Sequence, residues 1–213
     1  MTKKLLTLSF LFLISFSLTA QDDLLGELDA DTKNDTQYEL PAFKAMKIGN
    51  LQSTKIAASG DFYLIVSHRF GTLKDGLDNF FGLDEANTKI QLLYSFWDNV
   101  QLSISRESWR KTYAGALKIG LAKQSNNFPF NIVAYGTATV NTELKKANYP
   151  NLKYGDRMAY VGQLLISKRF SSDFSFEIAP SYIRENLQDL NLTGAANHNQ
   201  FAMAFGGRYK LSK

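Results

Sequence analysis

The sequence predicts an all-β protein, an antiparallel up-and-down transmembrane β-barrel of about eight strands. Three features predict it: repeated segments that alternate apolar and polar residues, connections that differ systematically in length, and aromatic residues near the segment ends. The first segment, residues 61–70, has Phe62, Leu64 and Val66 at even positions and Asp61 and Arg69 at odd positions. Successive side chains of a strand point to opposite faces, so this strand has one apolar face and one mixed face.

Seven later segments repeat this design. In residues 88–97, for example, Ile90 and Leu92 share one face, and Lys89 and Gln91 share the other. Pro180 counts against a central position for its strand, because proline has no backbone N–H to donate. The eight expected strands are residues 61–70, 88–97, 100–108, 112–123, 128–140, 157–170, 173–183 and 200–211.

Other segments predict shorter elements. Residues 43–48 are expected to form a short strand or a lid segment, and residues 49–59 a loop. Apolar residues at positions 73, 77, 80 and 81 are spaced for one face of a short helix, whose length Gly76 and Gly82 limit. We expect this helix to lie in a surface loop.

The connections sort by length. Those after residues 70, 140 and 183 are long, and those after residues 97, 123 and 170 are short; the connection after residue 108 is also short. Long and short links alternate when successive loops face the cell exterior and the periplasm. A soluble meander has no reason to separate its loops in this way, so the pattern favours a membrane barrel.

The N-terminus predicts export. Residues 1–20 resemble a cleaved signal peptide, because Lys3 and Lys4 precede an apolar run and Ala20 supplies a small residue at the expected cleavage site. Residues 21–40 are expected to form an acidic, flexible leader, since residues 21–39 hold seven acids and one base. The barrel domain is expected over residues 41–213, and the expected location is the outer membrane.

The composition narrows the protein class further. The chain has no cysteine, which excludes disulfides, thiolate metal sites and cysteine nucleophiles. After the signal peptide, no stretch approaches the roughly 18 apolar residues of a transmembrane helix, so the exported chain is either soluble or embedded as strands. Residues 40–213 carry 21 bases and 13 acids. These charges are spread along the strands without a cluster, so we expect no nucleic-acid partner.

A barrel directs its polar faces to the lumen and its apolar faces to lipid, so membrane lipid is an expected partner. The basic lumen favours small anionic solutes, but a narrow barrel filled by an internal ladder of ion pairs explains the same residues. The lumen-facing candidates are Asp61, Arg69, Lys89, Glu107, Lys118, Arg157, Arg169, Glu177 and Arg208. The lipid-interface candidates are Phe62, Phe70, Phe96, Phe128, Tyr160, Phe170, Phe174, Tyr182 and Phe201.

The sequence predicts no cofactor, no metal site and no enzyme. It contains no phosphate-binding loop, zinc-protease motif, calcium loop or dinucleotide fingerprint. A hydrolase of the serine type needs a histidine beside a serine and an orienting acid or polar group. His68 shares the apolar face of its strand, and His198 lies in a loop without an adjacent acid.

Three stretches resemble a family of uncharacterised outer-membrane β-barrel proteins of gram-negative bacteria, defined as a domain of unknown function. They are His68 to Gly71, Asn79 to Asp84 and Lys111 to Lys118. The resemblance covers most of residues 40–210 and implies a barrel fold and an outer-membrane location, but no activity. The chain either closes as a short barrel of about eight strands or is a truncated piece of a larger barrel.

The preferred function is that of an integral outer-membrane barrel with a structural role or porin-like passage of small solutes through a basic lumen. One alternative is a soluble, secreted β-barrel that binds an apolar ligand, with its aromatic face turned inward. Another is an outer-membrane enzyme that modifies lipids, which would need His68 or His198.

Overall fold

The computed structural model describes residues 37–83, 86–187 and 198–211. The chain divides into two compact units, Met1–Gln37 and Tyr38–Lys213, and only the second is considered below. The expected signal peptide and nearly all of the acidic leader lie outside the described residues.

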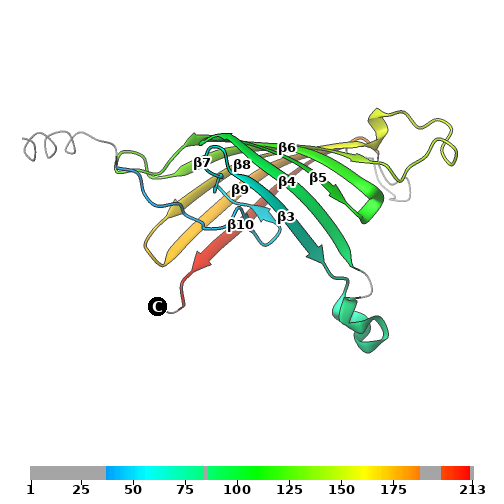
Figure 1. Ribbon diagram of the computed structural model, residues 1–213, viewed down its shortest axis with the longest axis horizontal. Helices are drawn as coiled ribbons and strands as arrows, with labels where there is room; N and C mark the ends of the chain where they lie inside the picture. Colours follow the sequence, from blue (N-terminus) through cyan, green and yellow to red (C-terminus); the bar gives the residue numbers. More distant parts are fainter. Residues whose placement is uncertain (1–36, 84–85, 188–197, 212–213) are drawn as a thin grey trace, which may run out of the picture. The chain divides into compact units, whose positions relative to one another are not determined.

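The second unit is an eight-stranded antiparallel sheet in which each strand pairs with its neighbours in the sequence, in the order β10-β9-β8-β7-β6-β5-β4-β3 (Figure 1). This confirms the predicted all-β, up-and-down architecture. The strands are β3 (Phe62–Arg69), β4 (Asn87–Trp97), β5 (Val100–Glu107), β6 (Thr112–Ala122), β7 (Asn131–Asn141), β8 (Met158–Arg169), β9 (Phe174–Glu185) and β10 (Asn199–Tyr209).

The strand boundaries follow the expected ones closely, with one exception. Strand β7 begins at Asn131, whereas the alternation predicted a start at residue 128. Residues before it form a turn, in which the Ser125 amide donates to the Phe128 carbonyl at 2.8 Å. Pro129 follows without a backbone N–H to offer a neighbouring strand, which explains the later start.

Pro180 lies in β9, a strand with neighbours on both sides, against the expectation for proline. The pairing of β9 with β8 runs to Gln163 and Ser181, and it resumes only at Ile166 and Ile178. The missing donor therefore falls in a gap of the ladder, which removes the cost of a central proline.

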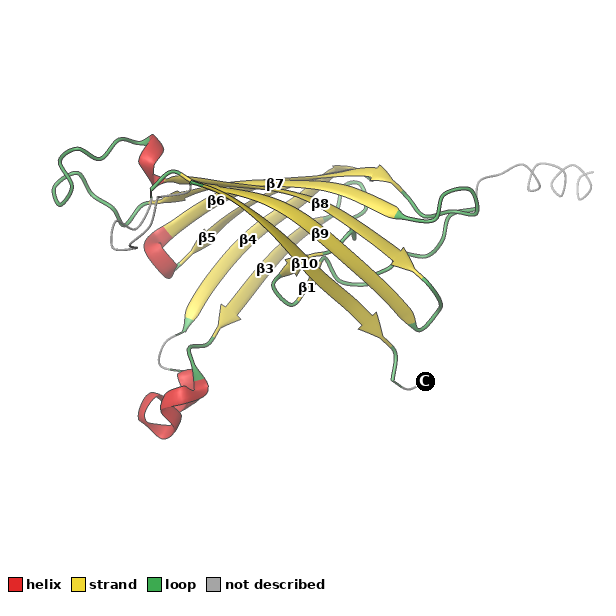
Figure 2. Cartoon of the chain, turned by 180° about the vertical axis from the view of Figure 1, so that it is seen from behind, coloured by secondary structure: helices red, strands yellow, loops and turns green. Residues whose placement is uncertain are grey.

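The sheet does not close on itself. Among the described residues, β3 pairs only with β4 and β10 pairs only with β9, so both are edge strands. Figure 2 shows the two edges diverging on either side of a curved sheet. The short barrel closed by these eight strands alone is therefore not what the structure has.

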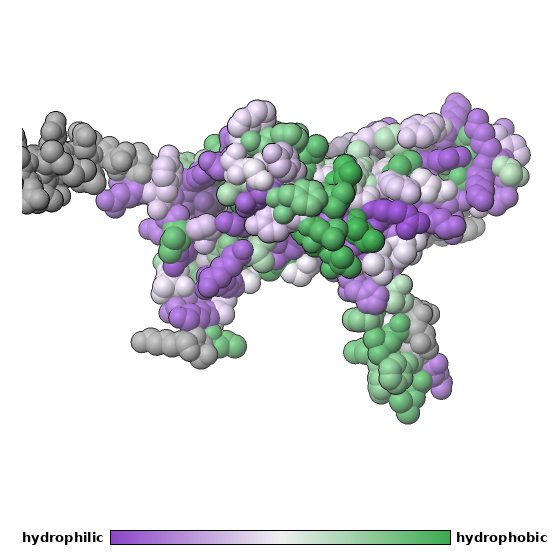
Figure 3. All heavy atoms as spheres, in the orientation of Figure 1, coloured by the Kyte–Doolittle hydropathy of each residue, from purple (hydrophilic) through white to green (hydrophobic). Residues whose placement is uncertain are grey.

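Smaller elements complete the unit. The residues expected as a short strand and a loop form a hairpin of β1 (Lys47–Ile48) and β2 (Leu51–Gln52). The predicted loop helix is present as η1 (Leu73–Gly82), a 3₁₀ helix whose apolar residues are exposed, visible as an apolar group in Figure 3. Two single turns, η2 (Trp109–Lys111) and η3 (Gly155–Arg157), lie at the same end of the sheet as η1.

Candidate functional site

One face of the sheet is apolar and open, and the opposite face is polar and largely covered. Along β4, Ile90, Leu92 and Tyr94 are exposed, while the alternating Gln91 and Leu93 are buried. A contiguous apolar surface of this extent is unfavourable in water and is the normal outward face of strands in a membrane. The covered inner face is therefore where a functional site can lie.

A segment from the N-terminal side covers the inner face. Residues 38–61, called the plug segment below, begin at the end of the sheet that carries the short turns, where Tyr38 forms a bridge with Ser125. The plug segment forms the β1–β2 hairpin and returns to the same end, where the Ser59 amide donates to Asp98 Oδ1 at 2.9 Å. Figures 1 and 2 both show this segment on the concave side of the sheet.

Two buried charges hold the middle of the plug segment. Lys118 on β6 is 1% exposed, and its Nζ donates to the carbonyl oxygens of Ser53 at 2.9 Å and Lys55 at 3.1 Å. Glu177 on β9 is fully buried, and its Oε2 accepts from the Thr54 amide at 2.8 Å. Such charge-assisted bonds are roughly twice as strong as neutral ones. Three consecutive residues, Ser53 to Lys55, are thus held by an ionisable side chain from β6 and another from β9.

Neutral hydrogen bonds connect the plug segment to further strands. Thr54 Oγ1 and Ser167 Oγ, on β8, lie 2.6 Å apart. The Ala57 amide donates to Gln101 Oε1 on β5 at 3.1 Å, and Ser95 Oγ on β4 donates to the Ala57 carbonyl at 2.9 Å. The contacts therefore extend across the sheet from β4 to β9.

Apolar side chains of the plug segment also pack against the sheet. A cluster of Val133, Leu165 and Ala179 packs against Leu51 and Ile56 of the segment. Ala42, Phe43 and Ala57 of the segment are also buried, and Ile48 and Leu51 lie against Gly206 on β10. The directional contacts come from the hydrogen bonds to side chains of the sheet. Water can replace hydrogen bonds far more readily than it can replace apolar packing.

The lumen-facing candidates are distributed over the inner face. Lys118 and Glu177 meet at the plug segment, as described above. Arg69 and Glu107 form an ion pair with an Nη1–Oε1 distance of 3.6 Å at the end of the sheet that carries the long loops. The structure therefore brings these four residues together as two pairs.

Of the other five lumen-facing candidates, Lys89 lies opposite Glu107 on the neighbouring strand. Asp61 accepts hydrogen bonds within its own turn, and Arg169 Nε donates to a backbone carbonyl two residues away. Arg157 Nε is buried and has no hydrogen-bond partner among the described residues. Lys89 and Arg208 are half-buried. That these side chains border an aqueous lumen remains a prediction.

The nine lipid-interface candidates are all exposed, with fractional exposures from 38% to 85%. Several of their rings contact one another: the ring centroids of Phe170 and Phe174 are 5.5 Å apart, and those of Tyr182 and Phe201 are 5.3 Å apart. Lys168 reaches the same surface, with its Nζ 5.3 Å from the ring centroid of Phe170. Their contact with lipid remains a prediction.

The interior near the long loops is electropositive. Burial lowers the pKa of the Lys47 ammonium on β1, and the nearby cations Lys89 and Arg69 lower this pKa further, while Glu107 opposes them. The β1–β2 hairpin therefore places one more cation, Lys47, near the cations of strands β3 and β4.

The two histidines contact an aromatic ring and a backbone carbonyl. The His68 ring packs edge-on against Phe70 at a centroid distance of 4.8 Å, and His198 Nδ1 lies 2.8 Å from the carbonyl oxygen of Glu185. Within the part of the chain that the structure describes, no group of three or more His, Asp or Glu side chains could hold a metal ion. None of the helices described there is long and apolar enough to cross a membrane.

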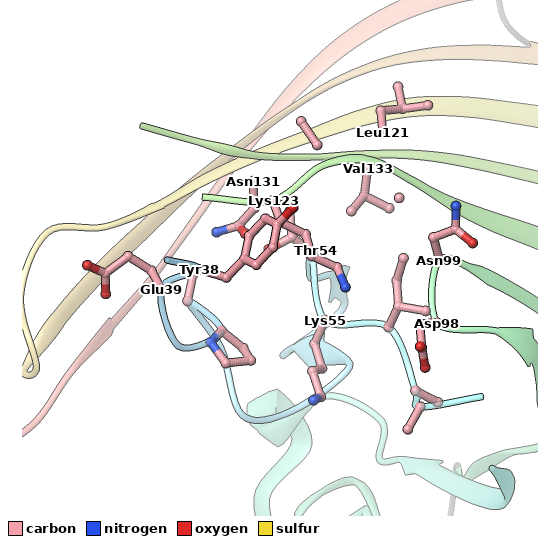
Figure 4. A pocket seen from close by; sticks show the side chains of 17 residues that line it. Tyr38, Glu39, Thr54, Lys55, Asp98, Asn99, Leu121, Lys123, Asn131 and Val133 are labelled. Carbon is pink, nitrogen blue, oxygen red and sulfur yellow. The ribbon is translucent and has the colours of Figure 1, made fainter. Parts of the chain in front are cut away.

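A pocket of about 720 Å³ opens between the plug segment, the β4–β5 turn and strands β6 and β7 at the short-turn end (Figure 4). Its lining includes the cations Lys55 and Lys123 and the acids Glu39 and Asp98. Neither ammonium group has a hydrogen-bond partner among the described residues. Asn131 also lines the pocket, and its Nδ2 is buried without a partner in the same set of residues.

Sequence reasoning missed the plug segment. Residues 38–61 lack a long alternating pattern, and their contacts with the sheet use small polar residues such as Ser53 and Thr54, which are also frequent in loops. The one available signal was the pair of charges at Lys118 and Glu177, whose positions on polar strand faces implied buried partners.

Fold and site together define a class of protein. Its antiparallel sheet is apolar on the outer face, and its polar inner face binds a segment of the same chain. The chain belongs to the family described as membrane-bound beta barrel domain (DUF5777), whose model matches residues 43–213. No curated protein and no solved structure gives a significant match. The family confirms the predicted membrane barrel of unknown function and contradicts the soluble alternative with an inward aromatic face.

Proposed function

We propose that the protein is an outer-membrane β-barrel that passes small anionic solutes through a basic interior, with the plug segment as its gate. The observation that carries this proposal is the polar attachment of the plug segment. The segment accepts hydrogen bonds from Lys118 and Ser95 and donates to Glu177 and Gln101. It can leave the sheet when water replaces those bonds.

The preference for anions rests on the charges near the path. Lys55 and Lys123 line the pocket at the short-turn end, and Lys47, Lys89 and Arg69 gather at the other end. Fixed cations of this kind lower the energy of an anion in a narrow aqueous path. In the pocket, Glu39 and Asp98 balance the two cations. The preference therefore rests on the long-loop end, where Glu107 alone opposes Lys47, Lys89 and Arg69.

The orientation follows from the connections. Barrels of bacterial outer membranes have short turns on the periplasmic side, so the two ends of the plug segment would face the periplasm. The predicted signal peptide agrees with delivery to that compartment. Release of the plug segment would accordingly be controlled from the periplasm.

A reversible crosslink tests the gate. Because Thr54 Oγ1 and Ser167 Oγ are 2.6 Å apart and the chain has no cysteine, the double variant Thr54→Cys, Ser167→Cys can form one disulfide between plug segment and wall. Anion current through a reconstituted bilayer should fall at least about tenfold when this variant is oxidised, and reduction should restore it.

The matched control is Thr54→Cys alone, whose current should not respond to oxidation. A reversal potential under a salt gradient reports whether anions carry the current. Absence of current in every form, or current that ignores the disulfide, would contradict the gated passage and favour a purely structural membrane role.

A further inference from the structure

Both edges of the sheet lie in the apolar surface. On β3 the outward Leu64 is 61% exposed, and on β10 the outward Phe201 is 85% exposed, compared with 37% for Leu164 on a central strand. In hydrocarbon, water is absent, and each unpaired backbone N–H or C=O costs several kcal/mol. The free edges of β3 and β10 therefore need strand partners.

Pairing β3 with β10 of the same chain would give a barrel too narrow for its contents. With strands about 4.8 Å apart and tilted by about 40°, eight strands enclose a backbone diameter of about 16 Å, which side chains alone fill. Facing sheets pack about 10 Å apart, so a hairpin with wall on two sides needs about 20 Å. The β1–β2 hairpin and the buried Phe43 thus demand more than eight strands.

The edge strands also lack the features that block strand addition. Natural edge strands are often short or carry proline, lysine or a bulge. Strand β10 has 11 residues and β3 has 8, and neither contains proline or lysine. Their pairings with β9 and β4 show no register shift, so both edges are regular enough to accept another strand.

We propose that a second copy of the chain completes the wall, with β3 of each copy pairing with β10 of the other in a sixteen-stranded barrel. An even number of strands in each copy makes β10 and the partner's β3 antiparallel when both copies share one orientation in the membrane. Sixteen strands enclose a backbone diameter of about 32 Å, which accommodates two plug segments. A two-fold axis along the membrane normal relates the copies and leaves no edge free.

This inference rests on the membrane-bound barrel fold and not on the proposed passage of solutes. The experiments below therefore measure which strands pair and the mass of the extracted assembly. A protein that conducts no ions could still satisfy both measurements.

The test uses cysteines in a chain that has none of its own. One tagged copy carries Leu64→Cys, and a second copy with a different tag carries cysteine at an outward β10 position: Phe201, Met203 or Phe205, one at a time. Both are expressed together, treated in membranes with a short bismaleimide, and separated by denaturing electrophoresis. We expect a covalent species with both tags for at least one of the three positions.

A double variant with Leu64→Cys and the responsive β10 substitution in one chain should likewise give covalent dimers. The matched control, Leu64→Cys with Leu92→Cys, joins residues that face each other on β3 and β4 and should crosslink within one chain. Light scattering of the unmodified protein extracted in mild detergent should give the mass of two chains.

Two results would overturn the proposal. A crosslink within one chain between β3 and β10 would show that the sheet closes on itself. A single-chain mass without any two-tag species, while the control pair reacts, would show that something other than a second copy covers the edges.

Discussion

At the scale of residues, two buried charges have the most specific role. The alternation placed Lys118 and Glu177 on polar strand faces, and this part of the site was available from sequence. Their partners were not, because Lys118 donates to the carbonyls of Ser53 and Lys55. Every residue offers a carbonyl, so no side-chain pattern marks which ones a buried lysine will reach.

Lys118→Met should loosen the plug segment. It removes two charge-assisted bonds, each contributing about 1.5–3 kcal/mol, and leaves the carbonyls of Ser53 and Lys55 without this donor. Hydrogen exchange at the Thr54 amide, which donates to Glu177, should therefore become at least about tenfold faster. Lys123→Met is the control, because that exposed ammonium has no hydrogen-bond partner among the described residues; equal acceleration in both variants would contradict the role given to Lys118.

Gly82→Ala should destabilise the loop that contains η1. Gly82 has φ +83°, and an added Cβ would lie 2.6 Å from the backbone of Gly71, whose amide donates to the Gly82 carbonyl at 2.7 Å. We expect a loss of about 1–3 kcal/mol in local stability and faster hydrogen exchange at the Gly71 amide. Gly155→Ala, at a site with no heavy atom within 4 Å, should leave exchange in its own loop unchanged.

At the scale of elements, the alternation of apolar and polar residues located all eight strands. The alternation is clear because only one face of each strand is covered by protein, while the other face is apolar and open. The start of β7 was misplaced because Phe128 and Phe130 continue the alternation into a turn, where Pro129 prevents pairing. The plug segment gave no periodic signal, because each strand of its hairpin has only two residues.

A charge on the outward face should cost stability in a depth-dependent way. Leu164 lies near the middle of β8 and Tyr160 near its end, and both are exposed on the apolar face. Leu164→Arg should lower the free energy of unfolding in lipid vesicles by about 2–4 kcal/mol, and Tyr160→Arg by about 0–1 kcal/mol. Urea titrations measure both; equal, small effects would mean that this face does not meet hydrocarbon.

At the scale of the whole molecule, the outward apolar surface predicts stable membrane insertion. The protein should remain in the membrane fraction after high-salt and carbonate washes. In intact membranes a water-soluble maleimide should react with Arg69→Cys and spare Leu64→Cys, since only the second position faces lipid in the proposed orientation. Both should react after denaturation. Release into the wash, or rapid reaction of Leu64→Cys with the water-soluble maleimide in membranes, would contradict the arrangement.

The amino-acid sequence by itself determined the strand number, the antiparallel order and the division into an apolar and a polar face, because these follow from side-chain alternation and connection length. Only the tertiary structure decided that the sheet stays open at β3 and β10 and that residues 38–61 occupy its inner side. Alternation records which side of a strand avoids water. It carries no information about which distant backbone groups will pair. The closure of a sheet and the position of a plug segment depend on such pairings.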